Sequence, residues 1–115
     1  MLQRRPGRII NIASAAAVRG LPGSPAYTAS KFPVVGLTQC LADEVMEKGV
    51  RVNVICPGPV KTELFDSSPL KDFLIKNPAN LHDMEDVTGA ALYLASDLSG
   101  GLNSQTLCIR KTSRW

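Results

Sequence analysis

The order of apolar runs along the chain predicts a parallel β-sheet. Residues 8–13 and 50–56 are short segments rich in valine and isoleucine, which is typical of buried strands. Between them, apolar residues recur at helical spacing. A strand, a helix and a second strand with no hairpin turn between them form a βαβ unit, whose strands run parallel with a right-handed crossover.

The helix between these strands has recognisable ends. We expect it to begin at Ser24, whose hydroxyl can cap free N–H groups, with Pro25 at a position that needs no N–H. We expect it to end at Lys48 and Gly49. Its predicted inner face consists of Val34, Leu37, Leu41 and Val45, flanked by Val35, Ala42 and Met46.

The C-terminal part of the chain predicts a second helix and a third strand. Asp83 is expected to cap a helix with acidic residues in its first turn, and two glycines at 100–101 break the chain after it. Residues 105–109 are a third strand candidate, and Ser68 is expected to start a short helix that ends before Asn77. We therefore predict one α/β domain over residues 1–115.

Charge and composition exclude several classes of function. The net charge of +3, from 13 basic and 10 acidic residues, is too small for a nucleic-acid interface. Cys40, Cys56 and Cys108 are widely spaced, and His82 has no neighbour at zinc-ligand spacing, so we expect neither a disulfide framework nor a metal site. No apolar run is long enough for a membrane span. These features favour a reducing, cytoplasmic location.

The candidate chemistry lies where the predicted strands end. Ser14 follows the first strand, and the 57–62 turn follows the second. Tyr27 and Lys31 are four residues apart and share a helix face. A phenol exchanges protons near neutrality only when a neighbouring group stabilises its phenolate, which the lysine could do, while the serine could bind a substrate oxygen. Taken alone, such a pair is more often a surface tyrosine beside a solvated lysine.

The whole chain resembles the short-chain dehydrogenase/reductase family. The catalytic serine of that family ends a strand much like residues 7–14, and its Y-x-x-x-K motif follows thirteen residues later. The second strand, the last helix and the last strand are also similar. The matching segments are Gly7–Ser14, Tyr27–Lys31, Arg51–Gly58, the P-G-x-V-x-T turn of Pro57, Gly58, Val60 and Thr62, Glu85–Asp97 and Gly101–Leu107.

The resemblance implies a partial Rossmann-like, doubly wound parallel sheet and an NAD- or NADP-dependent carbonyl reductase or alcohol dehydrogenase. It implies that Tyr27 is the acid or base, that Lys31 stabilises its phenolate and binds the nicotinamide ribose, and that Ser14 holds the substrate oxygen. Residues 63–81 would cover the substrate, and the chain resembles 3-oxoacyl reductases and hydroxysteroid-type members of the family. Oxo-acyl, steroid, sugar and small ketone substrates all remain open. The cofactor-binding turn would be formed by Pro57, Gly58, Val60 and Thr62.

Two departures from the family pattern matter. The glycine-rich T-G-x-x-x-G-x-G turn that holds the pyrophosphate is missing, together with the residues that choose NAD or NADP. The ending from Cys108 also replaces the usual Asp-Gly-Gly. A sheet lacking the earlier strands exposes an edge, so we expect a homo-oligomer or pairing through that edge. The alternatives are a noncatalytic remnant that self-associates or pairs with an intact relative, and a generic α/β binding module.

Other residues have simpler interpretations. Ser68 to Lys71 forms an S-x-x-K string, but the companion motifs of such serine nucleophiles are absent. Cys56 is expected to be a buried strand cysteine, and Tyr93 and Phe73 to be packing residues. Asn53 is expected mainly to bind loop backbone near the site.

Overall fold

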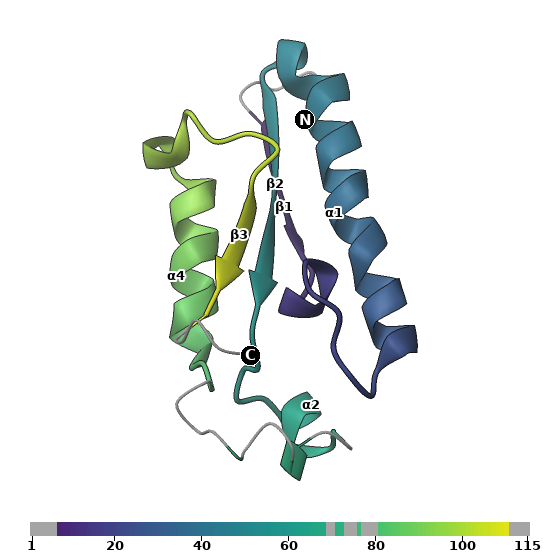
Figure 1. The fold of residues 1–115 in the computed structure, drawn as a ribbon. Helices are drawn as coiled ribbons and strands as arrows, with labels where there is room; N and C mark the ends of the chain where they lie inside the picture. The colour runs from purple at the N-terminus through teal and green to yellow at the C-terminus, as the bar shows by residue number, and fades with distance from the viewer. Residues whose placement is uncertain (1–6, 69–70, 73–75, 77–80, 111–115) are drawn as a thin grey trace.

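A computed structural model describes residues 7–68, 71–72, 76 and 81–110 (Figure 1). The strands are β1 (Gly7–Ile12), β2 (Val50–Pro57) and β3 (Thr106–Ile109). The helices are α1 (Pro25–Val45), α2 (Glu63–Asp66) and α4 (Met84–Ala95). Short 3-10 turns lie at Ala15–Ala17, Met46–Lys48 and Asp97–Ser99.

The three strands form one parallel sheet in the order β1-β2-β3, which confirms the predicted fold class. Gly7 of β1 is in register with Val50 of β2, and Val54 of β2 is in register with Thr106 of β3. Helices α1 and α4 lie on either side of the sheet (Figure 1). The central strand is therefore covered on both faces, as its nearly continuous apolar sequence predicts.

The core is centred on β2. On the α1 side, Val50 and Val52 pack with Ala42. Val54 and Cys56 pack with two alanines of the segment that follows β1, Ala13 and Ala17. Ile55 and Leu94 are also almost completely buried. Because β2 carries much of the buried apolar surface, it fixes the positions of the loops at both of its ends.

The inner face of α1 differs from the prediction. Leu37 and Met46 were expected to pack inward, but they are 62% and 57% exposed. Thr38 is fully buried instead, because its hydroxyl accepts a hydrogen bond from the Asn11 amide of β1 (2.8 Å) and donates one to the Val34 carbonyl (2.7 Å). A polar pair thus takes a place that hydrophobicity alone assigns to leucine.

The ends of α1 agree only in part with the prediction. The Ser24 side chain makes no capping hydrogen bond, so the predicted cap is wrong. Ser24 has a ψ of 58°, outside the extended conformation usual for a capping residue. The C-terminal end is as expected: Gly49 adopts a left-handed conformation (φ 68°) after the Met46–Lys48 turn.

A network of polar side chains holds the amino end of β2. Arg51 donates hydrogen bonds to the carbonyls of Ser99 (2.7 Å) and Leu102 (2.8 Å). Asn53 donates to the Leu102 carbonyl (3.0 Å) and accepts from the Gln105 N–H (2.9 Å). Asn53 therefore does bind loop backbone, but the expectation that this loop lies near the site is wrong, since it precedes β3.

Asp83 is the N-cap of helix α4 as predicted, and it forms a capping box with Asp86. Tyr93, predicted to pack inward, is 43% exposed because the buried side of α4 is centred on Leu94. Phe73 and most of the short helix predicted after Ser68 lie outside the described residues. The short helix α2, which was not predicted, follows the turn after β2.

Candidate active site

A cavity of about 600 Å³ opens at the carboxyl ends of β1 and β2. In parallel sheets, loops that follow neighbouring strands meet at this edge, which is where ligands bind. Six of the seven predicted site residues line the cavity: Ser14, Tyr27, Pro57, Gly58, Val60 and Thr62. The structure therefore brings together segments that are far apart in the sequence.

Ser14 is positioned by the end of β1. The Ala13 N–H still pairs with the Ile55 carbonyl of β2 (2.8 Å), which holds the chain in the sheet up to the serine. The Ser14 hydroxyl then accepts a hydrogen bond from the Ala16 N–H (3.1 Å) and caps the short turn after it. Because that bond occupies a lone pair, the O–H hydrogen can still be donated to a ligand oxygen.

Tyr27 and Lys31 lie in the first turns of α1. The tyrosine lines the cavity and is 46% exposed. The Lys31 ammonium lies over its ring, 5.5 Å from the centroid. The two residues therefore share one helix face, as their spacing predicts. Lys31 is not among the cavity-lining residues, so its contact with a cofactor ribose stays a prediction.

The turn after β2 is held by backbone hydrogen bonds. The Gly58 N–H donates to the Ile109 carbonyl of β3 (3.0 Å). The His82 N–H donates to the Pro59 carbonyl (2.8 Å), and the Lys61 N–H donates to the His82 carbonyl (3.0 Å). This short parallel bridge keeps the backbone of the 57–62 turn along one wall of the cavity.

The turn ends at Thr62, which begins α2. The Thr62 hydroxyl accepts a hydrogen bond from the Phe65 N–H (3.2 Å) and so caps the helix. Like Ser14, it keeps an O–H hydrogen for donation. Two hydroxyl groups with occupied lone pairs and free hydrogens therefore belong to the same cavity.

His82 supports the turn from behind, and sequence reasoning missed it. Its side chain is 2% exposed, and its Nδ1 lies 3.3 Å from an Asp86 carboxylate oxygen. A Cβ at Gly58 would lie 3.1 Å from two atoms of the imidazole ring. Glycine is needed at position 58 because the ring packs against its backbone. The sequence signal that could have revealed this role is the position of His82, directly before the α4 cap Asp83 and four residues before Asp86.

Cys56 lies in β2 just before the turn and is fully buried, as predicted. Burial raises the pKa of its thiol, and the neighbouring Cys108 raises it further. A hydrogen bond with the Ser14 backbone and the charge of Arg110 act in the opposite direction. The neutral thiol is therefore the form that this part of the sheet accommodates.

The outer wall of the cavity is mostly apolar. Leu21, Leu64 and Phe65 contribute large side chains to it, beside Ser67 and Ser68. The part of the predicted flap that the structure describes, at residues 63–68, thus borders the cavity. Most of the remaining flap, to Leu81, lies outside the described residues.

The described part of the chain has neither a candidate metal site nor a helix that could span a membrane. It contains no group of three or more His, Cys, Asp or Glu residues that could hold a metal ion. None of its helices has the length and apolar character needed to cross a membrane.

Comparison with known proteins identifies the family. The family model described as enoyl-(acyl carrier protein) reductase matches residues 1–111, which is nearly the whole chain. The chain belongs to the short-chain dehydrogenase/reductase family. The resemblance on which the site residues were predicted is therefore confirmed.

Members of this family with known names and structures are similar along the same segment. The 3-oxoacyl-[acyl-carrier-protein] reductase FabG of Rickettsia felis is 39% identical over 111 residues, covering 93% of this chain and 46% of the relative. A candidate NAD(P)-dependent gluconate 5-dehydrogenase from Beutenbergia cavernae, with NADP bound, superposes with a TM-score of 0.86 at 35% identity, covering 96% of this chain and 47% of that one.

A third relative is a short-chain dehydrogenase from Mycobacterium paratuberculosis bound to NAD, with a TM-score of 0.81 at 30% identity over 95% of this chain and 45% of that one. The chain thus spans about half the length of the short-chain dehydrogenases/reductases that it matches. It is an oxidoreductase-type sequence of a family whose solved members include proteins bound to NAD or NADP.

Proposed function

We propose that this chain carries the hydride-transfer side of an NAD(P)-dependent oxidoreductase that interconverts a carbonyl and a secondary alcohol. The observation that supports the proposal is the convergence of Ser14, Tyr27 and the 57–62 turn on one cavity at the carboxyl edge of a parallel sheet. These groups supply hydrogen-bond donors and a phenol, which suit proton transfer to and from oxygen.

The residues present fit the nicotinamide end of the cofactor. The backbone of the 57–62 turn lines the cavity with the Thr62 hydroxyl, where a carboxamide could bind through Val60 and Thr62. Pro57 and Gly58 shape this wall, and Lys31 beside Tyr27 would bind the ribose. When bound, NAD or NADP supplies the hydride. The sequence contains no glycine-rich turn for the pyrophosphate.

The side chains would manage the proton. In reduction, the Tyr27 O–H gives its proton to the carbonyl oxygen, and in oxidation the phenolate takes it from the alcohol. The Lys31 ammonium, 5.5 Å from the ring centroid, stabilises the negative charge on the phenolate. The Ser14 hydroxyl donates a hydrogen bond to the same substrate oxygen, where charge develops in the transition state.

The apolar wall favours a substrate with a hydrocarbon substituent beside the reacting carbonyl. Leu21, Leu64 and Phe65 are placed to contact such a group. A 3-oxoacyl thioester has this chemistry, and the Rickettsia felis relative is named as a 3-oxoacyl reductase. A hydroxysteroid is a second substrate of the same character.

The open edge of the sheet supports an association proposal. Among the described residues β1 pairs only with β2, and Ile12 at its end is 51% exposed. Unpaired strand edges attract further strands. We propose a homo-oligomer, or pairing through this edge, in the cytoplasm, with neither nucleic acid nor membrane as partner. The same edge favours the second candidate, a noncatalytic remnant that associates with an intact relative.

The test is a complementation assay. The chain is purified and mixed with NADPH or NADH and a 3-oxoacyl thioester, alone and with an equimolar polypeptide matching the N-terminal half of a FabG relative. Cofactor oxidation is followed for the chain and for Tyr27→Phe. Tyr93→Phe is the matched control, because Tyr93 is exposed on α4 and is not a cavity-lining residue.

Activity that falls at least about 100-fold in Tyr27→Phe and is unchanged in Tyr93→Phe supports the proposal. Activity that survives in Tyr27→Phe overturns the assigned proton donor. Absence of turnover in every mixture, together with a stable complex between the chain and an intact relative in size-exclusion chromatography, establishes the remnant instead.

A further inference from the structure

We propose that Cys56 and Cys108 are a thiol pair that a hydroperoxide converts into a reversible disulfide between β2 and β3. The two residues are direct register partners in the parallel sheet. Neighbouring strands lie about 4.8 Å apart, which is within the Cα separation of about 4.4–6.8 Å that a disulfide spans. The geometry of the sheet therefore brings the thiols within bonding reach. The inference does not depend on the proposed oxidoreductase activity.

The two cysteines face the same side of the sheet. Register partners in a parallel pair project their side chains to the same face, and Cys56 faces the α1 side together with Val54. The Cys56 thiol is also in hydrogen-bond contact with the Cys108 thiol. The two side chains therefore lie next to each other on one face of the sheet.

Cys56 and Cys108 differ in solvent exposure and therefore have different roles in the oxidation. Cys108 is exposed, so a hydroperoxide can reach it, whereas Cys56 is fully buried. The Cys108 thiolate attacks the peroxide oxygen, which breaks the O–O bond and yields a sulfenic acid and an alcohol or water. The Cys56 sulfur then attacks the sulfenic sulfur while the thiol proton passes to the departing hydroxide, so that the S–S bond forms and water is released. Two thiols are oxidised and one peroxide is reduced.

The bond is expected to be reversible. Relaxed disulfides hold their Cβ atoms about 3.8 Å apart, closer than parallel strands normally place them, so the ends of the strands must approach slightly. The four-residue edge strand β3 can make this adjustment. Such strain makes a disulfide easier to reduce. We therefore expect reduced glutathione to reopen it.

Oxidation would also reach the proposed active site. The Cys56 thiol makes a hydrogen bond with the Ser14 backbone. On the other strand, Cys108 precedes Ile109, whose carbonyl accepts the Gly58 N–H. A disulfide would compete with the hydrogen bond between Cys56 and the Ser14 backbone. It would also move β3, whose Ile109 carbonyl holds the turn through the Gly58 N–H.

The experiment treats the folded chain with one equivalent of hydrogen peroxide and maps its thiols by mass spectrometry after digestion without reduction. The expected product is a peptide pair linked through Cys56 and Cys108, with the loss of two hydrogen atoms and recovery of both thiols in reduced glutathione. The Cys108→Ser variant should lose the product completely. Cys40→Ser, which removes an exposed thiol from α1, should keep it.

A chain that carries oxidised Cys108 while Cys56 remains a free thiol overturns the proposal. So does a product dominated by links between two chains, or a yield of the Cys56 to Cys108 link that does not exceed the Cys40 to Cys108 link. Because the readout is a covalent mass, it is independent of turnover. A positive result with an inactive chain would leave the thiol pair standing while the proposed activity fails.

Discussion

The two ends of the sheet are built in different ways. At the amino end of β2, side chains of the strand bind loop backbone: Arg51 and Asn53 both reach the Leu102 carbonyl. At the carboxyl end, loop backbone binds loop backbone, and the side chains of Ser14, Tyr27 and Thr62 border the cavity. Hydrogen-bonding groups at one end are used to hold the fold, and at the other they remain available to a ligand.

The amino end also ties the elements together. The Asn103 side chain accepts the Val52 N–H (2.8 Å) and donates to the Ala42 carbonyl of α1 (3.4 Å). Ser104, next in the chain, has a left-handed φ of 61° and donates its N–H to the Val52 carbonyl (2.8 Å). Polar contacts with both α1 and β2 therefore hold the loop before β3 in place. Because these contacts stabilise the sheet at its amino end, the carboxyl end can contain an open cavity.

The largest expected effect is from removing the guanidinium of Arg51. Arg51→Met removes the charged donor to the Ser99 and Leu102 carbonyls, while the methionine keeps the apolar part of the side chain. The Ser99 carbonyl then keeps only the Leu102 N–H, and the Leu102 carbonyl only the Asn53 amide. Hydrogen bonds from a charged donor stabilise a fold more than neutral ones do, and two are lost, so we expect the free energy of unfolding to fall by about 2–4 kcal/mol. Urea denaturation followed by circular dichroism measures the change.

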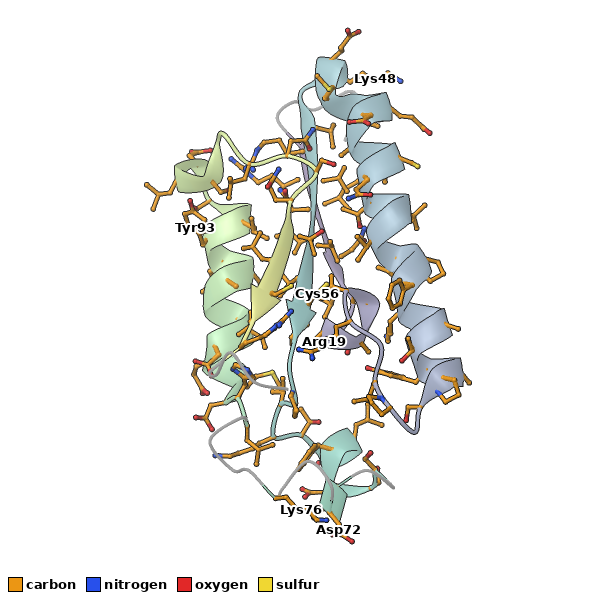
Figure 2. The ribbon with its side chains drawn as sticks, viewed as in Figure 1. Arg19, Lys48, Cys56, Asp72, Lys76 and Tyr93 are labelled. Carbon is orange, nitrogen blue, oxygen red and sulfur yellow. The ribbon has the colours of Figure 1, made fainter. Side chains whose placement is uncertain are left out.

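Arg19→Met is the matched control, because Arg19 is an exposed arginine of the loop after the first 3-10 turn (Figure 2). We expect its stability to stay within about 0.5 kcal/mol of the wild-type chain. Equal losses of unfolding free energy in the two variants would show that the Arg51 hydrogen bonds at the amino end of β2 do not stabilise the fold.

A smaller loss is expected from Gly58→Ala at the carboxyl end. The added Cβ would lie 3.1 Å from the His82 ring and 3.3 Å from the Ile109 carbonyl, so the ring or β3 must shift. We expect a loss of about 1–3 kcal/mol. Crowding should also displace the 57–62 turn, which amide chemical shifts of Lys61 and His82 can report.

Gly89→Ala supplies the control for this substitution. Gly89 lies within α4, and a Cβ there meets no atom within 4 Å. The same change should stabilise the chain by up to about 1 kcal/mol, because alanine favours helix more than glycine does. A Gly58→Ala variant as stable as the wild type would mean that His82 does not press on the turn.

Much of the fold could be predicted from local sequence, because the strands and the two main helices carry clear apolar periods and end signals. The structure differs from the prediction where a tertiary contact outweighs hydrophobicity. On the inner face of α1, for example, Thr38 is buried by its hydrogen bond with Asn11, and Leu37 is exposed. No periodicity reveals such a contact.

The candidate site was predictable for a different reason. Ser14, Tyr27 and the turn after β2 all lie at element ends that a parallel sheet must bring to one edge. The support behind them was not predictable, since the contact between His82 and Gly58 joins residues 24 positions apart with no shared pattern. Most of residues 69–80 of the predicted flap lie outside the described residues.

The smallest expected effect concerns the pH dependence of stability at the carboxyl end. Burial raises the pKa of the Cys56 thiol above its ordinary value of 9.0. Below that pH the thiol is protonated in both the folded and the unfolded chain. As the pH rises past 9.0, the unfolded chain releases its proton while the folded chain retains it, so stability falls until the pKa of the folded state is reached.

Cys56→Ala removes this contribution. Its stability should be lower than that of the wild type at neutral pH, because a buried side chain is shortened, but its decline above pH 9.0 should be shallower. The difference between the two slopes cannot exceed about 1.4 kcal/mol per pH unit, the value for one proton. Urea titrations at a series of alkaline pH values measure it, and Cys40→Ala should keep the wild-type slope. Parallel curves for the wild type and Cys56→Ala would show that the carboxyl end hydrates its thiol, which would make the two ends of the sheet more alike than their hydrogen bonds indicate.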